Sequence, residues 1–516
     1  MKKSSVLSFL LLSSLLGGCA SSSLPLEFSP FEDYMEEKDT LSDFDNGVYY
    51  RIRDNHSTYL KDQFPGLNGI KSFSDLSSLY LNGNKRILNS EQEARLLVVP
   101  ITFLDKDTSL LNDKKILIQN AFFGSDEMNK YLSVASFYNK SSYGHLKITG
   151  EVTDFITYPK NISEIDASKA SSKDEIINYA IDYLISSGFD YSSYKTQNDK
   201  YIDAIYFVYD HPHSSKGTND IYWAVSEHKT QPHGPLVNYA WSAFDFMQDE
   251  SGDIFKTHKV RANTFIHETG HLLGLLDYYN TSSGKYYQPT GFMDMMDYNV
   301  GDHSSFSKYS LNWSHPFVLK NEGEISIRDF SSSGDFILIP SSSYNDNPYG
   351  EYLLIEYFTP SGLNNSTYFP NYSYTNAKNE EKIFSYPTRY GLRIYHVDAR
   401  LGYFSFRQTD PFAFIDDSDE VIAVRYKSGN SYIDYYYNNS PSYDNEPVLV
   451  HLLEASGENT FASGNGASNE TLFRPGMVFN KNVFENYTFH SGEKLKYTFE
   501  FSDFRSSNVT LKFKIK

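Results

Sequence analysis

The chain has 516 residues, which is a soft prior for about three domains. Of these residues 40% are hydrophobic and 16% aromatic, so general disorder, which goes with low hydrophobicity, is excluded. The formal charge of −19 excludes a nucleic-acid partner, because phosphate binding needs a basic face. The single cysteine, Cys19, excludes an internal disulfide.

The first residues have the pattern of a signal peptide. Lys2 and Lys3 precede an apolar run over residues 6–16, which is too short for a bilayer span of about 20 residues. The run leads to Leu-Gly-Gly-Cys19, which resembles the bacterial lipobox. We therefore predict a lipoprotein signal peptide over residues 1–18, a lipid (palmitate-type) anchor on Cys19, and a position on the outside of a bacterial cell membrane. A secretory signal with a chance cysteine is the alternative.

The next part of the chain changes from polar to apolar. Residues 19–92 are polar and weakly periodic, and we expect a tether and N-terminal region there, which is a linker, a small subdomain or a prosegment. Between residues 93 and 210, strand patterns alternate with helical ones, which predicts an α/β layer. The expected elements are strands at residues 95–103, 144–152 and 202–209 and an amphipathic helix at 173–186.

Beyond residue 318 the pattern is that of strands. No convincing amphipathic helix interrupts it, so we predict a β-rich, sandwich-like C-terminal region over residues 318–516. The expected strands are 324–327, 336–340, 352–358, 392–397, 420–426, 448–453 and 509–515.

The most specific motif is H-E-x-x-H-x-x-G-x-x-D. His267 and His271 are four residues apart, so a helix places both on one face, where they can reach one ion at about 2.0–2.1 Å. Glu268 follows the first histidine, where its carboxylate can reach a water on the metal. Gly274 can adopt a left-handed conformation that ends the helix and turns the chain back. This turn makes Asp277 the predicted third ligand.

The third ligand has alternatives. Zinc peptidases that take a glutamate from a later helix are disfavoured, because no glutamate lies between Glu268 and Glu322. Asp277 could instead be a helix-end residue without a metal role, and the whole helix could be a core helix with hydrogen-bonded histidines. The other candidate ligands are Asp294, Asp297, His303 and His315.

A methionine-rich segment follows over residues 291–298. A methionine-bearing turn beneath the metal belongs to the metzincin pattern, whose usual form has histidine where this chain has Asp277. We assign Met296 to that turn. Tyr298, two residues later, could contact the metal or the oxyanion. Core filling is the alternative for these methionines.

Together these motifs resemble the immune inhibitor A family of secreted bacterial metallopeptidases, a metzincin-like group. Residues 136–150 are similar to the family's F-x-x-x-S-Y-G-x-L-x-x-x-G segment. Met293 and Asn312 depart from the family, which has tryptophan and glycine there, and Tyr298 replaces a smaller residue; these departures concern substrate preference more than the zinc site. The resemblance spans about residues 95–460 and includes the strands at 96–105, 201–209, 352–356 and 391–398.

The resemblance implies an α/β (α+β) metzincin-like catalytic domain over residues 93–317 with one catalytic Zn²⁺. With the anchor, it predicts a surface zinc endopeptidase that acts on proteins or peptides with Glu268 as general base. A structural Ca²⁺ ion is an additional cofactor that the sequence allows. The alternative function is a non-catalytic surface lipoprotein, an adhesin or glycan binder on the same scaffold. An intact Glu268 argues against it, since a binder needs no general base.

Overall fold

The computed structural model places most of the chain after residue 87. The described residues are 44–52, 88–196, 200–214, 220–248, 253–279, 288–369, 371–376, 379–405, 420–424, 448–502, 504 and 507–516. The predicted signal peptide, the lipid anchor on Cys19 and most of the N-terminal region therefore lie outside the described residues.

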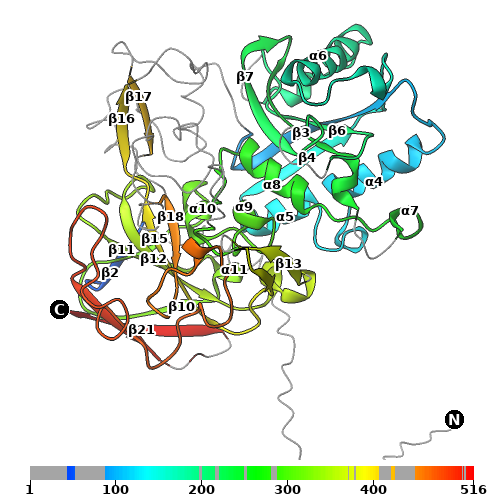
Figure 1. Cartoon of the computed structure of the whole chain (residues 1–516). Coiled ribbons are helices and arrows are strands. Elements are labelled where there is room, and N and C mark those ends of the chain that lie inside the picture. The colour runs from blue at the N-terminus through cyan, green and yellow to red at the C-terminus, as the bar shows by residue number, and fades with distance from the viewer. Residues whose placement is uncertain are drawn as a thin grey trace, which may run out of the picture.

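A six-stranded sheet forms the centre of the first half (Figure 1). Its strands pair in the order β4-β3-β6-β8-β7, and β5 also pairs with β3. All these pairs are parallel except β7 with β8. Parallel strands are buried on both faces, which explains why the expected strand at 95–103 is a continuous apolar run. The bounds are β3 Gln92–Phe103, β4 Leu146–Val152, β5 Ile156–Tyr158, β6 Ile205–Tyr209, β7 Val225–His233 and β8 Leu236–Ala243.

Helices cover both faces of this sheet. On one face, α6 (Ala170–Ser186) packs Ile177 and Ile181 against Leu97 and Val99 of β3. On the other, α4 (Leu111–Phe123), α5 (Val134–Ser141) and α8 (Asn263–Leu272) share a core with the alternate β3 residues. Figure 1 shows α6 above the sheet and the other three helices below it. The short α7 spans Ile254–Thr257.

A seven-stranded sheet dominates the second half, in the order β1-β2-β9-β11-β12-β15-β18. Apart from the parallel pair of β9 and β11, its strands are antiparallel. The first two strands come from the N-terminal region, which the sequence did not predict. The bounds are β1 Phe44–Asp45, β2 Tyr49–Arg51, β9 Phe317–Leu319, β11 Phe336–Pro340, β12 Glu351–Phe358, β15 Gly391–Asp398 and β18 Val450–Leu453.

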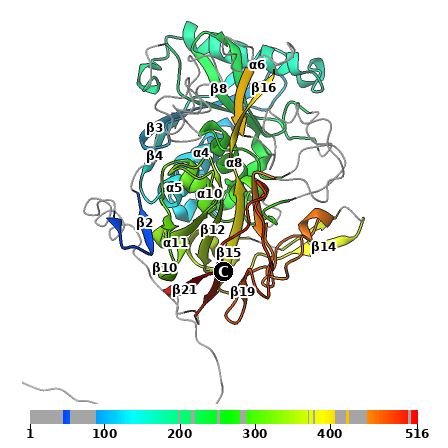
Figure 2. The ribbon, with the colours of Figure 1, turned by 90° about the vertical axis from the view of Figure 1, so that its left-hand side faces the viewer.

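The two faces of this second sheet pack against different partners. Leu338 and Leu354 join the core that contains α5 and α8, so the halves share one hydrophobic cluster. Leu353 and Ile355 point the other way and pack against a four-stranded sheet. Figure 2 shows β10, β21 and β19 of that sheet below β12 and β15. Its strands, in the order β10-β21-β20-β19, are β10 Gly323–Arg328, β21 Asn508–Ile515, β20 Tyr497–Phe501 and β19 Val478–Phe479.

Two hairpins and three short helices complete the described structure. The hairpins are β13 (Tyr372–Thr375) with β14 (Glu381–Phe384), and β16 (Leu401–Ser405) with β17 (Glu420–Val424). The helices are α9 (Met295–Tyr298), α10 (Ser305–Ser310) and α11 (Phe330–Ser333). The prediction of mixed α and β structure is thus confirmed. Within the described residues, no helix is long and apolar enough to cross a bilayer.

Candidate metal centre

The helix α8 carries the motif and ends where the sequence predicts. Gly274 has a φ of +93°, which is the left-handed conformation that glycine adopts without strain. The Leu275 amide donates to the Gly270 carbonyl at 3.0 Å and the Gly274 amide to the His271 carbonyl at 2.9 Å. This pair of bonds is a Schellman ending, and it satisfies carbonyls at the helix terminus. The chain then turns back toward the helix.

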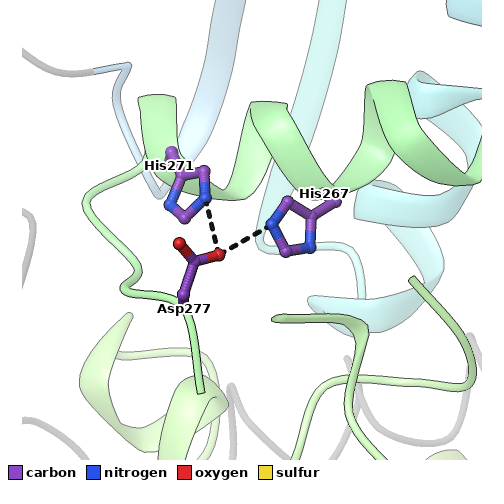
Figure 3. A group of neighbouring side chains, drawn as sticks. All are labelled: His267, His271 and Asp277. Atoms are coloured by element: carbon purple, nitrogen blue, oxygen red, sulfur yellow. Dashed lines mark hydrogen bonds and ion pairs between the residues drawn. The ribbon is translucent and has the colours of Figure 1, made fainter. Parts of the chain in front are cut away.

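The turn brings Asp277 opposite the two histidines (Figure 3). Its Oδ1 lies 2.9 Å from His267 Nε2 and 3.1 Å from His271 Nε2. Asp277 and His267 are buried, at 4% exposure each. The three donor atoms lie close enough together to hold one metal ion. The structure therefore brings together the three residues that the sequence predicts as ligands.

Both histidines are oriented by main-chain carbonyls. His267 Nδ1 donates to the Met295 carbonyl at 2.8 Å, and His271 Nδ1 donates to the Leu275 carbonyl at 2.8 Å. A proton on Nδ1 leaves a lone pair on Nε2, the atom that faces Asp277. Histidines that bind metals usually donate their other ring nitrogen in this way.

This donor set fits a zinc ion. Two imidazole nitrogens and one carboxylate oxygen are the ligands of a catalytic zinc site, with a fourth position open. Ligands at 2.0–2.1 Å around a tetrahedral ion are about 3.3 Å apart, close to the distances that Asp277 makes here. The carboxylate oxygen supplies negative charge to a divalent cation, and the imidazoles bind it through Nε2 once that atom has lost its proton.

Glu268 lies beside this group and is buried, with 6% of its surface exposed. Burial raises the pKa of its carboxyl, and the neighbouring histidines oppose part of that rise. Its Oε2 is buried and accepts no hydrogen bond from any described residue. A buried carboxylate oxygen without a donor is costly to keep, and a water molecule is one partner that would satisfy it.

The charge of Asp277 governs the protonation of its neighbours. Burial alone would lower the pKa of His271, but Asp277, by its charge and by a hydrogen bond, raises it to about 9. Conversely, the histidines overcome burial and hold the pKa of Asp277 well below its usual range. The carboxylate is thus ionised, as a metal ligand must be.

The methionine turn lies directly beneath α8. Asp294 caps α9 by accepting the Met296 amide at 2.8 Å, and the Met296 carbonyl accepts the Tyr278 amide at 2.8 Å. The Met296 side chain packs where Gly270 has no Cβ, since a Cβ there would be 2.5 Å from the sulfur. Gly270 thus lets the turn approach the helix between the two histidines. The sequence reasoning did not assign Gly270 this function.

The other candidate ligands are placed differently. Asp294 accepts main-chain amides through both oxygens, and Asp297 accepts from the Thr290 hydroxyl and the Phe292 amide. His303 is buried among Phe137, Tyr138 and Trp313. His315 Nε2 lies 2.9 Å from Asn312 Oδ1. Among the described residues, the metal-binding group that includes His267 and His271 contains Asp277 and none of these four.

Tyr279 and Tyr298 differ in their surroundings. Tyr298 is 39% exposed, and its ring stacks on Tyr372 with 4.5 Å between centroids. Tyr279 instead lies 6.4 Å from the His267 ring, centroid to centroid, at an interplanar angle of 25°. Burial, the charges of Asp277 and Glu268, and a hydrogen bond to Asp277 raise the pKa of Tyr279. Sequence reasoning missed Tyr279, although its place two residues after Asp277 was available as a signal.

Comparison of the chain with protein-family models and with curated proteins found no match.

Proposed function

We propose that this chain is a zinc-dependent endopeptidase with a metzincin-like catalytic domain over residues 93–317, followed by a sandwich-like region. The observation that carries the proposal is Oε2 of Glu268, which accepts no hydrogen bond from a described residue and is buried next to a histidine-histidine-aspartate group. A histidine cluster with a purely structural role does not require a buried carboxylate oxygen that lacks a donor. A general base does require one, because that oxygen must receive a water molecule. The sequence resemblance to immune inhibitor A peptidases agrees with this function.

In this mechanism the protein residues have distinct tasks. A bound zinc ion supplies Lewis acidity and makes a water molecule more acidic. His267, His271 and Asp277 hold the ion, and the Met295 and Leu275 carbonyls fix both imidazoles. Glu268 takes the proton of the attacking water through Oε2 and delivers it to the leaving amine. The raised pKa of Glu268 suits it to both steps, since a base is most effective when its pKa approaches the working pH.

The sheet edge next to the site suits a peptide substrate. Among the described strands, β7 ends the six-stranded sheet, and it lies against α8. An edge strand offers main-chain donors and acceptors, to which an extended peptide can pair. A substrate bound in this way passes along the helix that carries the histidines. This arrangement favours endopeptidase activity on extended segments of proteins.

Zinc content together with casein hydrolysis tests the proposal. The purified protein should contain zinc and cleave casein, lose cleavage on chelation, and recover it when Zn²⁺ is restored. Zinc binding without cleavage of casein or of a mixed peptide library would favour the surface-binding alternative. A protein that binds no zinc would contradict both the ligand assignment and the mechanism.

The localisation is part of the proposal and has its own test. Lipidation of Cys19 would hold the enzyme at the outer face of the cell membrane. Cys19→Ala should move the protein from the membrane fraction to a soluble or unprocessed pool, as seen in cell fractionation with immunoblotting. A variant that is cleaved after the signal and stays in the membrane fraction would show that another feature anchors it.

A further inference from the structure

A second histidine-carboxylate group lies in the C-terminal half, remote in sequence from α8. In the antiparallel pair β12 and β15, Glu351 stands directly opposite Asp398, and His396 lies two residues before Asp398 on the same face. The tight turn over residues 489–493 covers this end of the sheet and presents His490 to it. Three segments thus contribute to one group: two strands and one turn.

The donor atoms of this group lie nearly as close together as those of the first site. His396 Nε2 lies 3.0 Å from Glu351 Oε1, and His490 Nδ1 lies 4.0 Å from the same oxygen. Asp398 Oδ2 is 3.1 Å from His490 Nδ1. Donor atoms of Glu351, His396 and His490 all lie within 4.8 Å of one another. Small side-chain shifts would place them at about 2.0–2.2 Å from one ion.

Surrounding groups orient the donors for coordination. His396 Nδ1 lies 2.8 Å from the Tyr487 hydroxyl, which can accept its proton and leave Nε2 free to bind a metal. The amides of His490 and Ser491 donate to the two oxygens of Glu351.

The charges of the group leave room for a cation. Two buried carboxylates, Glu351 and Asp398, face each other across the strands, and like charges directly opposite each other destabilise a sheet. Arg400 pairs with both oxygens of Asp398, at 2.8 and 2.7 Å, but its nearest approach to Glu351 is 3.6 Å. The positive charge of Arg400 therefore mainly balances Asp398. The negative charge of Glu351 remains beside the two imidazoles.

We propose that Glu351, His396 and His490 bind a second zinc ion, with Asp398 as the fourth donor, and that this ion fastens the 489–493 turn to the seven-stranded sheet. Two imidazoles favour zinc over calcium, which prefers oxygen ligands. Four protein donors leave no open position, which is the arrangement of a structural rather than a catalytic site. The main alternative is a hydrogen-bonded ion-pair network of the same residues without a metal.

Zinc counting distinguishes these two possibilities. The double variant His267→Ala/His271→Ala removes the first site and leaves the second group untouched. After dialysis against a buffered nanomolar concentration of free Zn²⁺, mass spectrometry of the metal should find one zinc per chain in this variant. The wild-type chain should hold two. A double variant with no zinc would overturn the proposal, whatever the peptidase assays show.

The location of the remaining ion is tested by adding His490→Ala, which replaces the most exposed of the three side chains, at 23% exposure. Zinc content should fall from one per chain to none, and added Zn²⁺ should no longer raise the melting temperature. Retention of one zinc would overturn the assignment. The matched control is His233→Ala, which removes another histidine paired to a carboxylate, Asp182, at 2.8 Å and outside the group. The control should keep its zinc.

If His490→Ala prevents folding, as circular dichroism would show, the less disruptive His490→Gln replaces it in the same measurement. The count in the double variant remains decisive in either case, since that protein has an unaltered second group. Loss of casein cleavage in the double variant with one zinc retained would support both proposals. Two zinc ions per chain in a Glu268→Gln protein that still cleaves casein would leave this proposal standing and contradict the proposed mechanism.

Discussion

Two groups of the same residue types, each with two histidines and an acid, occupy different scaffolds in this molecule. In the first, a single helix supplies His267 and His271, and the turn after Gly274 supplies the acid. In the second, two strands and a turn supply Glu351, His396 and His490. The first is visible as a motif because its members are close in sequence. The second spans 140 residues and becomes visible only when the chain is folded.

The groups differ most in how their carboxylates are used. In the second group, both oxygens of Glu351 accept main-chain amides, and both oxygens of Asp398 pair with Arg400. In the first group, Glu268 keeps one oxygen without a hydrogen-bond donor among the described residues. Both groups have a geometry that could hold a metal ion. Among the described residues, only the first has a carboxylate oxygen without a donor beside its ligands, and our proposal that the first is catalytic and the second structural rests on that difference.

In the first group, the largest loss of zinc affinity should come from replacing its acidic ligand, Asp277. Asp277→Ala removes the one ionised oxygen that faces both Nε2 atoms. Loss of an outer partner costs 10–100-fold in metal affinity, and loss of a direct ligand should exceed about 100-fold. Zinc competition with a chelator measures it, and casein cleavage should fall with the zinc. Asp277→His, which restores the usual metzincin ligand, should recover part of the binding.

The control for this change is Asp154→Ala, because the Asp154 side chain is 96% exposed and pairs with Lys115 on the surface. Its zinc affinity should equal that of the wild type. Asp294 and Asp297 are weaker controls, since both are buried and bonded to main-chain amides. If Asp277→Ala keeps wild-type zinc affinity and activity, the third ligand is another residue, and the first candidates are His303 and Asp294.

The two tyrosines allow binding and turnover to be separated. Tyr279→Phe removes a hydroxyl that contacts Asp277, so we expect zinc affinity to fall by about 10–100-fold. Tyr298→Phe should retain zinc. If Tyr298 stabilises the oxyanion, this second change should lower kcat by about 10²–10³-fold, the usual cost of one oxyanion donor.

Chelator competition and steady-state kinetics on both variants measure these effects. The comparison is matched, since each change deletes one phenolic oxygen. Unaltered kcat in Tyr298→Phe would remove this residue from the mechanism and leave its ring as packing for Tyr372. Unaltered zinc affinity in Tyr279→Phe would show that the Tyr279 hydroxyl is not needed to orient Asp277.

A smaller effect is expected from the packing beneath α8, a feature that the second group lacks. Gly270→Ala places a methyl group against the Met296 sulfur, and overpacking costs about 1–3 kcal/mol. Alanine also gains up to about 1 kcal/mol of helix propensity over glycine. We expect a net loss of about 1 kcal/mol in the free energy of unfolding in urea. In a Met296→Ala background the same change should become neutral or stabilising. If Gly270→Ala costs the same free energy of unfolding in the Met296→Ala background, the Met296 side chain is not the group that a methyl group at residue 270 contacts.

Several elements of the fold followed from sequence pattern alone. The continuous apolar run at 95–103 is strand β3, and the helical spacing at 173–186 is α6. The strands at 336–340 and 392–397 also formed as predicted, because their alternating residues meet a different core on each face. β1 and β2 were missed. They are two and three residues long; β1 pairs with β2, and β2 pairs with β9, which is more than 260 residues away in sequence.

The candidate site was more predictable than its surroundings. Spacing along one helix places His267 and His271, and the glycine turn places Asp277, so local rules are sufficient for all three. The Met295 carbonyl, the ring of Tyr279 and the close approach of Met296 to Gly270 depend on how separate segments pack. No periodicity in the sequence encodes those contacts. The second group was missed for the same reason.

The central claim is that Glu268 is the general base of a zinc peptidase, and one measurement tests it directly. Glu268→Gln preserves the volume of the side chain and leaves the three ligands intact, while it removes the proton-accepting charge. Zinc content and circular dichroism should match the wild type, and kcat on casein should fall by about 10²–10⁴-fold. A zinc-loaded, folded Glu268→Gln protein that turns over within about threefold of the wild type would contradict the account.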